Sequence, residues 1–180
     1  MKGIVFTEFF DMVEDTFGFD MADDLVNECD LPSGGIYTAV GTYDHMEMVS
    51  LVSRLSEKSE VPLPTLLNAF GKHLMKTFSS RYGTFFEESD SVFDFLSKIE
   101  DYIHVEVAKL YPDAELPRFD IQFNGPDILE MVYHSSRGMA DLAEGLIEGS
   151  IAHFGEEIHI HREDFNEART HSKFTLSKVV

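Results

Sequence analysis

The chain has 180 residues, of which 43% are hydrophobic and 16 are phenylalanine. Such a composition is too apolar for a disordered chain, and the length suits a single domain that buries roughly 70% of its unfolded surface. The 33 acidic and 14 basic residues give a formal net charge of -19, which disfavours nucleic acids and anionic membrane surfaces as partners.

The cysteine content and the start of the sequence indicate a compartment. Cys29 is the only cysteine, so the chain cannot form an internal disulfide and a reducing environment is expected. No apolar run is long enough to span a membrane, and the segment MKGIVFTEFFDMVED has acids where a secretion signal would stay apolar. We therefore expect a cytoplasmic protein.

The first 110 residues have the periodicity of helices. Val5, Phe9 and Met12 recur at helical spacing, and Gly18 is placed to end this first helix. Further helices are expected at residues 21–29, 47–56, 64–78 and 91–110, the last allowing one break. A loop at residues 31–35 precedes a short extended stretch, which we place at residues 36–43.

The pattern changes after Pro117 to that of a sheet with one helix inserted. Phe119, Ile121 and Phe123 alternate with polar residues, a turn sequence follows, and residues 128–133 are again extended, which predicts a hairpin. A helix then carries its apolar residues on one side, and strand-like alternation returns at the end of the chain. These elements are the helix from about residue 139 to 151 and the strands at 158–161 and 174–179.

These elements predict an α+β fold in one domain, residues 1–180. We expect an N-terminal helical part, residues 1–60, packed on a mixed part, residues 61–180, that contains a four-stranded antiparallel sheet and long helices. We find no internal repeat and no linker composition, which favours a shared core.

The most informative motif is the segment from Tyr133 to Arg137. If it is extended, Tyr133, Ser135 and Arg137 face one way while His134 and Ser136 face the other. A guanidinium supplies a charged planar fork for an anion, and two hydroxyls add neutral donors. The pattern suits paired carboxylates or a phosphate, although a strand end with incidental polar residues would have the same sequence.

The order of the motifs along the chain resembles the heme nitric oxide/oxygen binding family, H-NOX. The likeness rests on the start Met1-Lys2-Gly3, the segment Ala69-Phe70-Gly71, the helix with His104, the Leu116-Pro117-Arg118 segment and the Tyr-x-Ser-x-Arg motif. This heme-sensing domain occurs alone in bacteria and at the front of animal soluble guanylate cyclase subunits. The resemblance covers nearly the whole chain and implies a heme buried between its two parts.

The resemblance implies a role for five residues around a heme b cofactor. His104 would be the proximal iron ligand, Tyr133, Ser135 and Arg137 would hold the heme propionates, and Pro117 would press on the porphyrin and hold it out of plane. Each role suits the residue's chemistry, since a neutral imidazole can bind heme iron and a guanidinium can bind carboxylates. Taken alone, a histidine on an apolar helix is more often packed or at the surface.

The resemblance also predicts which gas is bound. Leu142 stands where oxygen-binding members place a tyrosine, and the other residues above the iron would be Val5, Phe9, Leu74, Phe78 and Leu146, all apolar. Bound dioxygen needs a buried donor more than nitric oxide does, so we expect binding of nitric oxide, weaker binding of carbon monoxide and exclusion of oxygen. His73 could supply a donor only if its helix were rotated.

The family's signalling implies a partner rather than an enzymatic activity. Nitric oxide would weaken the bond to His104, strain against Pro117 would relax, and the helix would shift. The partner would be a separate histidine kinase or cyclic-di-GMP enzyme.

One feature of many bacterial members is missing. They hold a zinc ion with three cysteines and a histidine near the C-terminus. Here His161 would take the histidine position, but Met139, Phe165 and Ser172 stand where thiolates would be. No zinc is expected.

Two other functions are open at this stage. His159 and His161, with Glu157, His153 or His171, could bind a metal and support hydrolysis. A heme storage or transfer protein would share the heme-binding residues but would not respond to nitric oxide through a partner.

Overall fold

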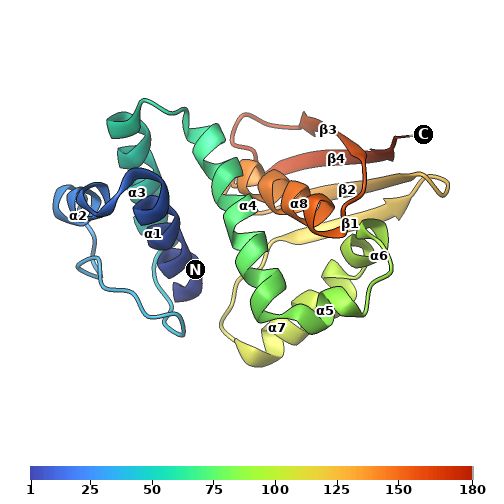
Figure 1. Ribbon diagram of the computed structural model, residues 1–180, viewed down its shortest axis with the longest axis horizontal. Coiled ribbons are helices and arrows are strands. Elements are labelled where there is room, and N and C mark those ends of the chain that lie inside the picture. The colour runs from blue at the N-terminus through green and yellow to red at the C-terminus, as the bar shows by residue number, and fades with distance from the viewer. Residues whose placement is uncertain (180) are drawn as a thin grey trace.

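The computed structural model describes residues 1–179. Three helices form the N-terminal group at the left of Figure 1, followed by helices of the central part and a C-terminal sheet with one long helix. The helices are α1 (Gly3–Phe17), α2 (Phe19–Glu28), α3 (His45–Ser59), α4 (Leu63–Arg81), α5 (Gly83–Glu87), α6 (Val92–Ser97), α7 (His104–Leu110) and α8 (Ala140–Phe154). A π-helical turn, η1 (Ile99–Ile103), joins α6 to α7.

The sheet has the order β1-β2-β4-β3, and every neighbouring pair is antiparallel. Its strands are β1 (Arg118–Phe123), β2 (Ile128–His134), β3 (Ile158–Asp164) and β4 (His171–Lys178). Met131 on β2 lies opposite Phe174 on β4, and both side chains are fully buried beneath α8, which crosses this face of the sheet in Figure 1. The predicted α+β class with a four-stranded antiparallel sheet is therefore confirmed.

The local sequence explains where the N-terminal helices begin and end. The side chain of Asp44 accepts a hydrogen bond from the backbone N–H of Met46 at 2.9 Å, which caps α3. Gly18 has a φ of 89° and separates α1 from α2, a conformation that favours glycine. The predicted helices at 47–56 and 64–78 are present with longer bounds, and the one at 21–29 is present at 19–28.

The predicted extended stretch at residues 36–43 is wrong. Its only ladder contact is an isolated bridge between Lys2 and Thr42. The rings of Tyr37 and Tyr43 instead pack on Phe6, with ring centroids 4.4 and 5.6 Å away. The alternation in this segment therefore reflects aromatic packing on α1 rather than pairing with a strand.

The predicted helix at residues 91–110 is divided. It consists of α6, the turn η1 and α7, so the break occurs just before His104. The short helix α5 was not predicted, because five residues are too few to show a helical period.

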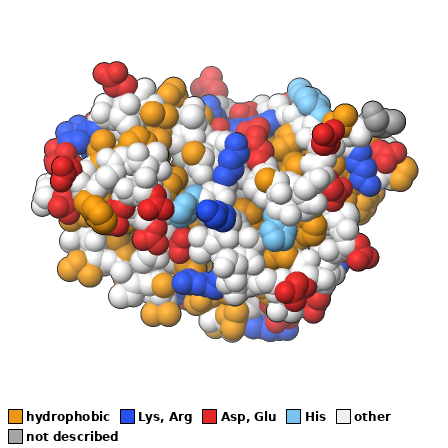
Figure 2. All heavy atoms as spheres, viewed as in Figure 1, with side chains coloured by type: hydrophobic (Ala, Val, Ile, Leu, Met, Phe, Trp, Pro, Cys, Tyr) orange, Lys and Arg blue, Asp and Glu red, His pale blue; other side chains and the backbone are white. Residues whose placement is uncertain are grey.

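Two hydrophobic clusters meet along α4. Leu66, Phe70 and Leu74 belong to the cluster shared with α1–α3, and Met75 belongs to the cluster formed with α6, α8 and the sheet. The division into residues 1–60 and 61–180 stays a prediction. Figure 2 shows acidic side chains over the N-terminal helices at the left of this face, with basic side chains near its middle.

Helices α4 and α8 approach closely enough for their backbones to touch. A Cβ atom on Gly71 would lie 2.4 Å from the carbonyl oxygen of Leu142, and one on Gly145 would lie 2.0 Å from that of Asn68. Both distances are far below van der Waals contact, so glycine is required at the two positions. Among the described residues, no helix combines the length and apolarity needed to cross a bilayer.

Candidate functional site

An apolar cavity of about 310 Å³ lies between the helices and the sheet. Its lining comes from α1, α4 and α8, from β2 and the turn that follows it, and also from α5, α6, η1, α7, β1 and the segment between α7 and β1. A volume of this size, with apolar walls and a few polar groups at defined positions, is typical of a site for a small molecule or cofactor. Several phenylalanine side chains line the cavity, among them Phe78, Phe85, Phe86, Phe95 and Phe119.

His104 lines this cavity at the first residue of α7, and its side chain is 17% exposed. Burial lowers the pKa of His104, while the nearby Glu100 carboxylate acts in the opposite direction. The imidazole is therefore neutral at neutral pH and keeps a nitrogen lone pair for a metal. Its Nδ1 atom is buried and has no hydrogen-bond partner within the described part of the chain.

Tyr133, Ser135 and Arg137 all line the same cavity. The Tyr133 side chain is buried, burial raises its pKa, and its hydroxyl accepts a hydrogen bond from the backbone N–H of Met139 at 3.3 Å. The Arg137 guanidinium is 14% exposed and donates to the backbone oxygen and the carboxylate of Glu115 at 2.9 and 2.8 Å. Two hydroxyls and a guanidinium thus meet at one cavity.

The reason for this convergence differs from the prediction. Strand β2 ends at His134, so Ser135 and Arg137 lie in a turn rather than on an extended strand. The backbone N–H of Ser135 donates to the oxygen of Thr170 at 2.9 Å, which ties the turn to the loop before β4. Gly138 closes the turn with a φ of 62°, and a Cβ atom there would lie 2.3 Å from the oxygen of Ala168.

Most of the predicted apolar residues line the cavity. Val5 comes from α1, Leu74 and Phe78 from α4, and Leu142 and Leu146 from α8. Pro117 also lines it, just before β1.

Phe9 and His73 are not among the lining residues. Phe9 is fully buried in the N-terminal cluster with its ring 5.4 Å from that of Phe70, and the His73 Nε2 atom lies 3.4 Å from the Glu8 carboxylate.

Sequence reasoning missed several polar groups at the cavity. Tyr82, Tyr111 and Ser150 also line it, and the Ser150 hydroxyl donates to the backbone oxygen of Leu146 at 2.9 Å. Glu100 does not line the cavity but lies beside His104, and it was also missed although it stands four residues before it, a spacing that brings side chains together on a helix. That spacing was the one signal available in the sequence.

The other predicted metal site has little support. His159 and His161 lie on the same exposed face of β3. Within residues 1–179, no group of three or more histidine, cysteine or acidic side chains could hold a metal ion.

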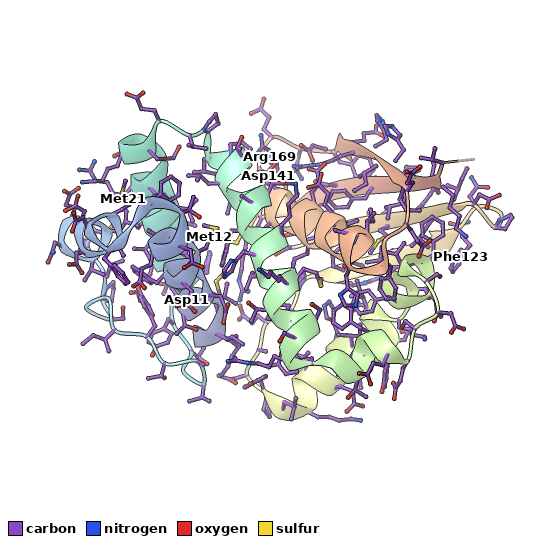
Figure 3. The ribbon with its side chains drawn as sticks, viewed as in Figure 1. Asp11, Met12, Met21, Phe123, Asp141 and Arg169 are labelled. Atoms are coloured by element: carbon purple, nitrogen blue, oxygen red, sulfur yellow. The ribbon has the colours of Figure 1, made fainter. Side chains whose placement is uncertain are left out.

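A network of ion pairs includes Ser172, one of the positions where the resemblance would place a zinc-binding thiolate. Arg162 donates to Asp141 at 2.7 Å and to Glu144 at 2.9 Å, and Ser172 donates to Asp164 at 2.7 Å. Arg169 also pairs with Asp141, and Figure 3 shows these two side chains together near the start of α8. The network joins α8 to β3 and β4.

The residues at the cavity fit a heme. The walls are apolar, one wall carries a buried, neutral imidazole, and a guanidinium with two hydroxyls is placed for carboxylates. The chemistry of this donor set is that of a ligand to iron together with a grip for an anion.

Comparison with known proteins agrees with this chemistry. The family described as Haem-NO-binding matches residues 2–162. A K. algicida H-NOX protein in the Fe(II) unliganded state is 38% identical, with a TM-score of 0.96 over 100% of this chain and 97% of that chain. Comparison with curated proteins finds no significant match.

Two Shewanella structures are also similar. An H-NOX from Shewanella woodyi, bound to IWP-051 in the Fe(II)CO state, is 41% identical, with a TM-score of 0.85 over 99% of this chain and 95% of that one. An S. oneidensis H-NOX in the Fe(II)NO state is 27% identical, with a TM-score of 0.92 over 100% of both chains. The fold and the site thus define a heme-binding gas-sensor domain. The chain belongs to the H-NOX family.

Proposed function

We propose that this chain senses nitric oxide through a ferrous heme b held by His104. The observation that carries the proposal is the single cavity that receives a neutral, buried imidazole together with Tyr133, Ser135 and Arg137. His104 would hold the iron, and the other three residues would hold the two propionates. When bound, the heme would supply an iron with one open position for a diatomic gas.

The surrounding residues would set the selectivity. Val5, Leu74, Phe78, Leu142 and Leu146 exclude water and offer no hydrogen-bond donor to a bound gas. Because bound dioxygen carries partial negative charge, an apolar surrounding disfavours it relative to nitric oxide. The similar S. oneidensis and S. woodyi structures, with nitric oxide and carbon monoxide respectively, support these two ligands for this chain.

Oxygen exclusion is tested by the absorption spectrum of the reduced protein in air. We expect an unchanged ferrous spectrum in air and a new spectrum with nitric oxide. The Leu142→Tyr variant adds a donor within the cavity and should bind oxygen more tightly by about 10- to 100-fold, the effect of about 1.5–3 kcal/mol from a hydrogen bond to a charged group. Leu142→Phe, which adds the same ring without the hydroxyl, is the matched control and should not raise the oxygen affinity. A stable oxygenated spectrum of the unmodified protein would contradict the selectivity.

The output would pass to a separate partner, and the chain itself would not be an enzyme. We propose that this chain is cytoplasmic, that its partner is a histidine kinase or a cyclic-di-GMP enzyme, and that the chain holds no zinc. Release of His104 would allow α7 to shift relative to Pro117, so the gas would act by changing the balance between two conformations.

Proximal release is tested with His104→Gly supplied with free imidazole. The variant should bind heme, but nitric oxide should no longer change the activity of the partner, because the iron is no longer joined to α7. The readouts are the heme spectrum and partner activity with and without nitric oxide. Normal regulation by the variant would exclude the mechanism, and heme exchange without any partner response in the unmodified protein would favour heme storage.

A further inference from the structure

Glu100 places a carboxylate beside the buried imidazole. It lies in η1, and its Oε2 atom is 3.4 Å from the Nδ1 atom of His104. The same oxygen accepts a hydrogen bond from the backbone N–H of Phe119 at 2.8 Å. Glu100 is thus fixed to the start of β1 while it faces His104 on the helical side.

The Nδ1 atom needs such a neighbour. It is buried, and the Glu100 Oε2 atom 3.4 Å away is not aligned for a hydrogen bond. Nδ1 therefore has no hydrogen-bond partner among the described residues. A neutral imidazole that binds a metal through one nitrogen carries its proton on the other, and a buried N–H without an acceptor is costly. Metal-bound histidines therefore usually donate to a carboxylate or a carbonyl.

The other acidic side chains near His104 are differently placed. Asp101 is exposed, and Glu106 pairs with Lys109 at 2.6 Å on the surface of α7. Glu100 is the carboxylate that the geometry brings to the ring.

We propose that Glu100 is a positioning residue for His104, whose carboxylate accepts the Nδ1 proton, fixes the ring and strengthens its donation to iron. This inference rests on the proposed function, because it needs His104 to bind the heme. Glu100 also contacts Phe119, two residues after Pro117, so one side chain joins the helix that would hold the iron to the segment that would press on the porphyrin. A shift of α7 would change this contact.

The test is Glu100→Gln, measured on the heme-loaded full chain. Glutamine keeps an oxygen that can accept from the Phe119 N–H, so the fold is preserved while the negative charge is lost. The iron–histidine stretching frequency, from resonance Raman spectra of the ferrous protein, should fall. The equilibrium between ferric and ferrous heme should move about tenfold toward ferrous, since partners of this kind change metal-site properties 10- to 100-fold. Tenfold corresponds to about 59 mV for one electron.

Two further variants distinguish a direct contact from a general charge effect. Asp101→Asn removes the same charge from the next residue, on an exposed side chain, and should leave the frequency unchanged. Glu100→Asp keeps the charge but withdraws it from the ring. Its iron–histidine frequency should therefore lie between that of the unmodified protein and that of Glu100→Gln. If Glu100→Gln fails to fold, Glu100→Asp carries the test alone.

The outcomes separate this inference from the proposed function. If Glu100→Gln leaves both readouts unchanged, or if Asp101→Asn shifts them equally, Glu100 does not position His104. If the unmodified protein binds no heme, the proposed function itself is wrong. It is also wrong if the His104→Gly variant, measured without imidazole, still shows the iron–histidine band.

Discussion

Arg137 shows how a single side chain can be shared between two structural roles. Its guanidinium donates twice to Glu115, whose side chain is 85% exposed, and it also lines the cavity. A surface ion pair of this kind contributes at most about 1 kcal/mol, so Glu115 can yield Arg137 to a propionate at little cost.

We therefore expect Arg137→Gln to speed heme loss at least about tenfold, since a hydrogen bond to a charged group contributes about 1.5–3 kcal/mol. The measurement is the rate of heme transfer to an excess of apomyoglobin. Arg118→Gln is the matched control, because Arg118 is 69% exposed and lies outside the apolar cavity. Equal rates for the two variants would mean that Arg137 does not hold the cofactor.

At the residue scale, most of the residues that the sequence predicted at the site line the cavity, whereas many of the other lining residues were not predicted. The motif order and the family resemblance were sufficient for that, whereas the extended geometry assumed for Ser135 and Arg137 was wrong because β2 ends at His134. Glu115 could not be found, because its contact with Arg137 depends on how the loop after α7 approaches the turn after β2. The roles of His104, Tyr133, Ser135 and Arg137 at a heme stay predictions.

The close contact between α4 and α8 leads to a prediction at the scale of elements. Gly145→Ala would place a methyl group 2.0 Å from the Asn68 oxygen, so the helices must separate. We expect a loss of about 1–3 kcal/mol in the free energy of unfolding, the usual cost of overpacking. Urea denaturation of the heme-free and heme-loaded protein measures this.

Gly83→Ala is the control for this substitution. A Cβ atom on Gly83, at the start of α5, would approach only the Glu87 side chain, at 3.8 Å. The change in stability should be within about 0.5 kcal/mol, as for most surface positions. Similar losses for both variants would mean that the spacing between α4 and α8 is not the cause.

The sequence predicted elements well where one period dominated. The hairpin of β1 and β2 followed from alternation and a turn sequence, and α8 followed from its apolar stripe. The prediction of an extended stretch at residues 36–43 was wrong because packing of Tyr37 on Phe6 produces the same alternation as a strand. The π-helical turn before His104 has no sequence period of its own, so only a break could be expected there.

At the scale of the whole molecule, Lys2 joins the N-terminal helices to the segment after α7. Its Nζ atom donates to the Thr42 hydroxyl at 2.8 Å and to the Asp113 carboxylate at 3.2 Å. The hydrogen bonds from Thr42 and Lys2 lower the pKa of Asp113, so the carboxylate stays ionised in near-neutral solution. This contact connects the two parts of the chain beside the cavity.

We expect Asp113→Asn to loosen this connection with little effect on global stability, since the carboxylate is exposed. The backbone N–H of Tyr43, which donates to the Met1 oxygen at 2.9 Å, should then exchange with solvent several-fold faster. Amide hydrogen exchange measures this. Asp23→Asn, on the exposed face of α2, is the control, and equal exchange in both variants would show that Asp113 does not hold the two parts together.

The overall architecture could be predicted because helical and alternating segments were well separated along the chain. The position of α4 between two hydrophobic clusters could not, since its apolar residues belong to both and the sequence does not show which partner each one contacts. The cavity is a product of that packing and not of any single segment.

The direct backbone contact between α4 and α8 has a consequence for how the binding site can diversify. The side chains of Leu74, Phe78, Leu142 and Leu146 project from a pair of helices whose separation is set by glycines rather than by those side chains. Exchange of one of these four residues for a larger, smaller or polar one would alter the cavity, while the distance between α4 and α8 would stay the same. The shape and polarity of the cavity can therefore change by single substitutions while the contact between α4 and α8 stays the same.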